Sequence, residues 1–137
     1  MIIQIHVPIY RCSVLCFCNS TLEEFDKFYY KNVKGFTNKE YEDVRNYIKN
    51  DKSSYAWTQH LETTDIMIWF TRPRVDMDVV HEFYHATHMI LVERGIFHDD
   101  EKGTGDEPFA YLLGYLVNEY YVTLDNMENE NKTEKTL

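Results

Sequence analysis

The sequence lacks any apolar run close to the roughly 20 residues that a membrane-spanning helix needs. Its first eight residues are mostly apolar, but no basic segment precedes them and His6 and Pro8 interrupt them, which is unlike a secretion signal. Positive charge is also scarce, since 14 Lys and Arg stand against 23 Asp and Glu, giving a net charge of −9. Nucleic acids and anionic membranes need clustered Lys and Arg. We therefore expect a soluble, cytoplasmic protein that binds neither.

Cysteine is present but does not form the pattern of a disulfide framework or of a zinc ribbon. Cys12, Cys16 and Cys18 are odd in number and lie within seven residues, with no second pair downstream. Cys16 and Cys18 would share one face of a strand, so a second metal site of the C-x-C type is an alternative. Free cysteines are commonly buried, and we expect three reduced core thiols whose further role the sequence does not indicate.

The chain has the length and composition of one domain, with 137 residues of which 44% are hydrophobic. We expect this domain to span residues 1–124 and a polar, flexible tail to span residues 125–137. Apolar periodicity and turn residues predict the following elements: one or two strands within 2–17, helices over 21–31 and from 37 or 38, strands over 55–61 and 65–70, and helices over 75–94 and 106–123. The fold class is therefore α+β, with a small antiparallel or mixed sheet.

The stretch His81-Glu82-Phe83-Tyr84-His85 contains the pattern H-E-x-x-H within the predicted helix 75–94. Residues four apart lie on the same helical face, so His81 and His85 can hold one metal ion. Glu82 lies beside the first histidine, where its carboxylate can take a proton from a water that zinc has made acidic. The alternative is two polar residues on a surface helix. The mid-helix position favours a zinc hydrolase, with Zn²⁺ as its cofactor.

A catalytic zinc usually takes three protein ligands and keeps one position for water. The downstream candidates for the third ligand are His88, Glu93, His98, Asp99, Asp100, Asp106, Glu107 and Glu119. His88 lies two turns after His81, about 10 Å along the helix, too far to share the same metal readily. Glu107 is favoured because it begins a second helix that can return antiparallel past the first. First-turn complementation of the helix dipole is the alternative role for Glu107, and Glu119 is the second choice.

Hydrolysis also needs a donor to the oxygen on which negative charge develops in the transition state. Tyr111, His98 and His88 are the candidates for this role or for the edge of the cleft, although a tyrosine is more often a packing residue. The strand 55–61 pairs with 65–70 in a predicted hairpin just before the metal helix. Its edge can bind an extended peptide substrate, or it can simply cover the helix.

The run from Val79 to Tyr120 resembles phage-encoded zincin-like metallopeptidases. It contains HEFYHATHMIL, a short loop with Gly and Asp, and DEPFAYLLGYL, and it covers about the C-terminal third of the chain. The resemblance implies a minimal zincin-like domain in which His81, His85 and Glu107 bind zinc and Glu82 is catalytic. The glycine and third histidine of a metzincin are replaced by His88 and Leu91, which places the chain with the glutamate-ligand zincins.

Two functions follow from these patterns. The first is a zinc metallopeptidase that hydrolyses a peptide or isopeptide bond in a peptide or protein substrate. The second is a catalytically silent zincin fold that serves as a structural or interaction protein, such as a component of a phage virion. In the first case the protein is expected in the cytoplasm of the host cell, and in the second on the virion. The small domain leaves few residues to wall a substrate pocket, so a homo-oligomer or a virion partner is expected to complete it.

Overall fold

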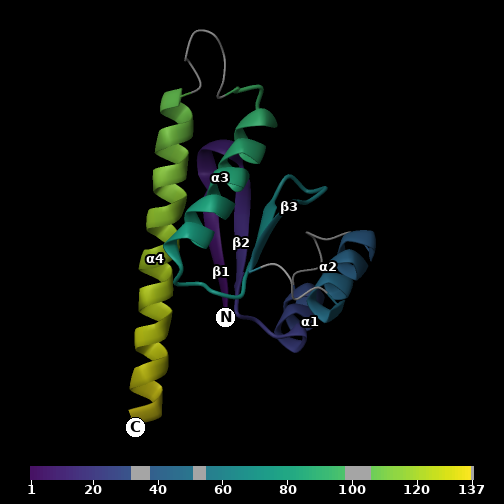
Figure 1. Ribbon diagram of the computed structural model, residues 1–137, viewed down its shortest axis with the longest axis vertical. Coiled ribbons are helices and arrows are strands. Elements are labelled where there is room, and N and C mark those ends of the chain that lie inside the picture. The colour runs from purple at the N-terminus through teal and green to yellow at the C-terminus, as the bar shows by residue number, and fades with distance from the viewer. Residues whose placement is uncertain (32–37, 51–54, 98–105, 137) are drawn as a thin grey trace.

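A four-stranded sheet lies between two pairs of helices (Figure 1). The computed structural model describes residues 1–31, 38–50, 55–97 and 106–136. In chain order, its elements are β1 (Ile2–Val7), the short 3₁₀ helix η1 (Pro8–Tyr10), β2 (Cys12–Cys18), α1 (Leu22–Lys31), α2 (Asn38–Asn50), β3 (Ala56–His60), β4 (Ile66–Phe70), α3 (Asp76–Val92) and α4 (Asp106–Thr136). The expected α+β class is confirmed.

The two central strands come from the two most apolar runs of the sequence. β2 and β4 are buried at every residue and run parallel to each other, as is typical of strands that are covered on both faces. β1 pairs antiparallel with β2, and β3 pairs antiparallel with β4, so the strand order is β1-β2-β4-β3. The predicted hairpin of β3 and β4 is thus confirmed. The sheet is mixed, and β1 and β3 form its two edges.

The two faces of the sheet have separate cores. Helices α1 and α2 cover one face with an aromatic layer that includes Phe17, Phe25 and Trp69, while α3 and α4 cover the other. Cys12, Cys16 and Cys18 are free thiols in the α3–α4 core, as expected. Burial raises the pKa of the Cys16 thiol well above its ordinary value, so this thiol stays protonated and unreactive.

Helix α3 lies within a residue or two of its predicted bounds and ends as its sequence indicates. Gly95 adopts a left-handed conformation with φ of 70°, and the N–H of Ile96 donates to the carbonyl of Leu91 at 3.0 Å, closing the last turn. Val80 is 43% exposed, whereas Val79 is fully buried. The 3.6-residue period places Val79, rather than Val80, on the buried face with Phe83.

Helix α4 extends to Thr136, so the predicted end near residue 123 is wrong. The segment after Leu124 contains no Gly or Pro that would end a helix. Contacts with the loop before α3 stabilise the beginning of this segment. Arg74 forms ion pairs with Asp125 at 2.6 Å and with Glu128 at 2.7 Å. Figure 1 shows α4 running in the opposite direction to α3 and continuing beyond the sheet. The polar composition of residues 125–137 therefore led to a predicted helix that is too short.

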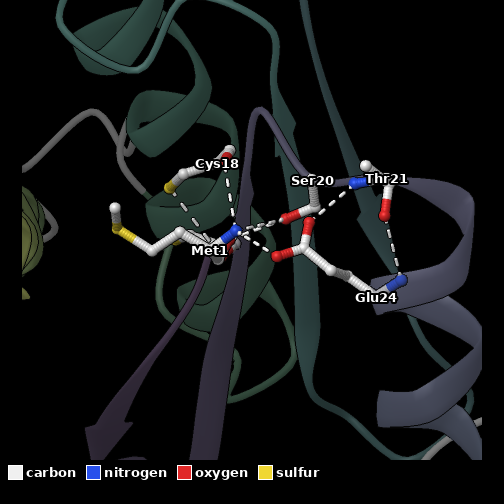
Figure 2. A network of polar contacts seen from close by, with 6 residues as sticks. Met1, Cys18, Ser20, Thr21 and Glu24 are labelled. Carbon is white, nitrogen blue, oxygen red and sulfur yellow. Dashed lines mark hydrogen bonds and ion pairs between the residues drawn. The ribbon is translucent and has the colours of Figure 1, made fainter. Parts of the chain in front are cut away.

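The N-terminus is fixed to the start of α1 by a polar network (Figure 2). The amino group of Met1 donates to the side chains of Ser20 at 3.2 Å and Glu24 at 3.1 Å. Thr21 and Glu24 form a capping box, because the Thr21 N–H donates to Oε2 of Glu24 at 2.8 Å and the Glu24 N–H donates to Oγ1 of Thr21 at 3.1 Å. With this network α1 begins at Leu22, one residue from the predicted start at residue 21.

Candidate metal centre

The two histidines of the H-E-x-x-H pattern lie together on the exposed face of α3. Nε2 of His81 and Nε2 of His85 are 3.1 Å apart, and the two rings are nearly perpendicular, with an interplanar angle of 78°. Tetrahedral zinc with Zn–N bonds of about 2.0–2.1 Å would separate two such nitrogens by about 3.3 Å. A hydrogen bond between two neutral imidazoles would also fit this distance. The separation is thus close to that of two ligands of one zinc ion, and it fits a direct hydrogen bond between the rings equally well.

Glu82 lies between the histidines in the sequence, but its side chain points away from theirs, toward β3. It is 7% exposed, and Oγ1 of Thr58 donates to its carboxylate oxygen Oε2 at 2.5 Å. The same hydroxyl lies 3.3 Å from the backbone carbonyl of Glu82. A buried carboxylate needs such a donor, since an unpaired one would be costly. Thr58 is the residue that the sequence analysis missed, because a single threonine in a strand carries no motif.

A cavity of about 340 Å³ opens beside these residues, between the start of α3 and the start of β3. Tyr55, Ala56, Met77, Asp78, His81 and Glu82 line it. Arg72 donates two hydrogen bonds of 2.8 and 2.9 Å to Asp78, and the Arg72 guanidinium also stacks 3.6 Å over the Tyr55 ring. The charge of Asp78 is thus neutralised at the wall of the cavity.

The structure does not bring Glu107 into the group formed by His81 and His85. Glu107 is exposed in the first turn of α4, on the far side of α3 from β3. The rings of Tyr84 and Phe109 pack between the two helices with centroids 5.0 Å apart. Among the residues that the structure describes, no three His, Cys, Asp or Glu side chains are grouped closely enough to hold a metal. Glu107 as third ligand stays a prediction.

The other predicted site residues are distributed around the molecule. Tyr111 is 76% exposed and lines a groove with Val7 and Pro8, at the β1 edge of the sheet, whereas His81 lies near the opposite edge, β3. His88 is exposed on α3 beyond the histidine pair. Neither Tyr111 nor His88 therefore lies beside Glu82.

Three of the remaining candidates fall outside the described residues, and one has another partner. His98, Asp99 and Asp100 lie in 98–105, which the structure does not describe. Glu93 is directed toward His60 on β3, with Oε1 3.4 Å from Nε2. Because Glu93 is directed toward the edge strand, it does not lie beside the histidine pair. The described part of the site consequently consists of His81, His85, Glu82 and Thr58.

Two further observations bear on the class of protein. Within 1–31, 38–50, 55–97 and 106–136, no helix combines the length and apolar character that crossing a membrane requires. Comparison of the chain with protein-family models, with curated proteins and with solved structures found no match.

Proposed function

We propose that this protein is a zinc-dependent metallopeptidase in which His81 and His85 bind the metal and Glu82 is the general base. The observation that carries the proposal is the 3.1 Å separation of the two Nε2 atoms beside a buried glutamate. When bound, zinc supplies a Lewis acid that lowers the pKa of a water to about 7 and polarises a carbonyl. Glu107, from the α4 side, is the proposed third ligand, as the resemblance to glutamate-ligand zincins implies.

The residues around Glu82 support peptide hydrolysis in particular. The Glu82 carboxylate accepts the proton of the attacking water and returns it to the leaving amine. β3 is an edge strand, so its outer backbone groups can pair with an extended peptide and hold a carbonyl near His81. The adjoining 340 Å³ cavity has room for one substrate side chain. Ala56 and Met77 in its lining, together with the paired Asp78, favour an uncharged side chain there.

Zinc content tests the proposal directly. We expect about one zinc ion per wild-type chain after dialysis, none in the His81→Ala/His85→Ala double variant, and unchanged content in Glu82→Gln, as measured by elemental analysis. His6→Ala is the matched control, because it removes an exposed histidine on β1 and should retain zinc. A wild-type chain without zinc after expression in zinc-supplemented medium would contradict both the ligands and the peptidase function.

The alternative function, a catalytically silent interaction protein of the zincin fold, is favoured by a different observation. An apolar groove of about 520 Å³ lies between η1 and α4, with Ile9 81% exposed and Tyr111 76% exposed. Exposed apolar surface of this kind commonly marks an interaction site. Cleavage of a peptide library by the wild type but not by Glu82→Gln favours the peptidase, and equal background cleavage favours the interaction protein.

A further inference from the structure

We infer that Thr58 is a positioning residue that fixes the carboxylate of Glu82 for its role as general base. This inference rests on the proposed function and adds a residue outside the H-E-x-x-H pattern. The contact joins two segments 24 residues apart in the chain, with Oγ1 of Thr58 donating to Oε2 of Glu82 at 2.5 Å. It links the edge strand β3 to the helix that presents the histidines.

The strand geometry explains why the side chain at position 58 reaches Glu82. Side chains alternate along β3, so that Trp57 packs in the aromatic core with Tyr47 while Thr58 and His60 face α3. Thr58 lies opposite Ile68 on β4, a buried residue of the α3–α4 core. Because β4 is a central strand, Thr58 is held on a rigid support. Glu82 is 7% exposed and Thr58 is half-buried, so the contact is partly shielded from water.

A tethered carboxylate is better suited to proton transfer than a free one. A glutamate has three rotatable side-chain bonds, and fixing Oε2 leaves Oε1 as the oxygen that can accept a proton from water in the neighbouring cavity. Glu82 and His81 both line that cavity, so the proposed general base and the first proposed ligand border the same space. Misplacing a catalytic group by about 1 Å can reduce the rate about 100-fold. Removing the tether should therefore slow the chemical step without weakening substrate binding.

Thr58→Val tests this because it keeps the shape and β-branching of the side chain and removes only the hydroxyl. We expect kcat on a fluorogenic peptide library in zinc-containing buffer to fall about 10- to 100-fold, with KM nearly unchanged. Thr58→Ser, which restores the hydroxyl, should recover most of kcat. Thr133→Val is the matched control, because it removes an exposed hydroxyl that contacts a backbone carbonyl far along α4.

Two readouts are independent of activity. Zinc content and affinity should be the same in Thr58→Val and in the wild type, because Thr58 is not a ligand. The urea midpoints of Thr58→Val, Glu82→Met and the double variant should be non-additive, because each single change removes one partner of the same hydrogen bond. Additive midpoints would show that the contact is absent in solution and would overturn the inference.

The outcomes separate the inference from the function on which it rests. Cleavage by the wild type with unchanged kcat in Thr58→Val would contradict the positioning role alone. A fall in kcat that Thr58→Ser does not recover would also contradict it, because the hydroxyl would then not be responsible. Zinc binding and a non-additive Thr58–Glu82 pair without cleavage by the wild type would contradict the positioning role and the peptidase function together.

Discussion

The two faces of the sheet differ in their cores and in the side chains at their margins. The face under α1 and α2 is closed by stacked rings, such as Phe17 on Trp69 with centroids 5.4 Å apart, and its helices bear none of the candidate site residues. The face under α3 and α4 has a core of aliphatic side chains, thiols and rings, and polar groups at its margin beside β3. A site at a margin can be anchored in the core and still open to solvent. Glu82 and His85, buried and exposed respectively, illustrate both conditions.

The largest expected effects come from removing one ring from each face. Phe25 in the aromatic layer and Phe83 under α3 are both fully buried, and changing either to Ala should cost about 3–5 kcal/mol of unfolding free energy. Phe83→Ala should also weaken zinc binding, because Phe83 supports the helix that holds the histidines. Phe25→Ala should leave the zinc affinity of the folded chain unchanged. Urea unfolding and zinc titration measure the two effects. Equal weakening of zinc binding by both variants would contradict the claim that the site depends on the α3–α4 face alone.

The next largest effect concerns whether α4 contributes to the site. Glu107→Ala should weaken zinc affinity by more than about 100-fold if Glu107 is a ligand, because outer partners of a ligand already cost about 10- to 100-fold. Glu130→Ala is the control, as it removes an exposed carboxylate farther along the same helix. Competition with a zinc-binding dye measures both affinities. Equal small losses of zinc affinity in both variants would show that Glu107 only complements the helix dipole. The third ligand would then be another residue.

A smaller effect is expected at Tyr120, which joins α4 to both β2 and the loop before α3. Its hydroxyl donates to the carbonyl of Pro73 at 2.9 Å and lies 3.5 Å from Sγ of Cys18, and burial raises the pKa of this phenol. Tyr120→Phe should reduce the unfolding free energy by about 1–3 kcal/mol because it removes the donor to the Pro73 carbonyl in a partly buried contact. Tyr115→Phe breaks a comparable 2.8 Å bond at an exposed position and should cost less. Equal losses in thermal unfolding would contradict this account.

The smallest effect is the pH dependence of the capping network on the α1–α2 face. The hydrogen bond from the Thr21 N–H lowers the pKa of Glu24, and the Met1 amino group lowers it further. A lowered pKa stabilises the fold above the ordinary value near 4.5, and this contribution is lost as the pH falls through the folded-state pKa. Glu24 is 44% exposed, so the contribution should be well under 1 kcal/mol.

A comparison of acid unfolding between the wild type and Glu24→Gln tests this dependence. The difference in stability between the two proteins should shrink as the pH is lowered below about 4.5, because the wild-type carboxylate is then protonated. Zinc content at neutral pH should be the same in both proteins, since the network lies on α1. A difference in stability that does not change with pH would show that the charge of Glu24 does not contribute.

Local patterns were sufficient for most of the elements. The 3.6-residue spacing predicted α3 and continuous apolar runs predicted the central strands, and the observed helix ends lie at capping residues such as Thr21, Glu24 and Gly95. These features depend on neighbours within one turn or one strand, and such neighbours are fixed by the sequence. The same local logic failed for the end of α4, where Arg74 pairs with Asp125 and Glu128 from 51 and 54 residues away.

The sequence by itself determined that His81 and His85 share a helical face with Glu82 beside them, because the helix period makes residues four apart neighbours. Only the tertiary structure decided what surrounds them. It placed Thr58 against Glu82, turned Asp78 toward Arg72, and left Glu107 and Tyr111 away from the pair in the described conformation. These relations arise from the order of the strands and the packing of α3 between β3 and α4. No local spacing encodes the contact of Thr58 with Glu82, because the two residues lie 24 positions apart in the chain.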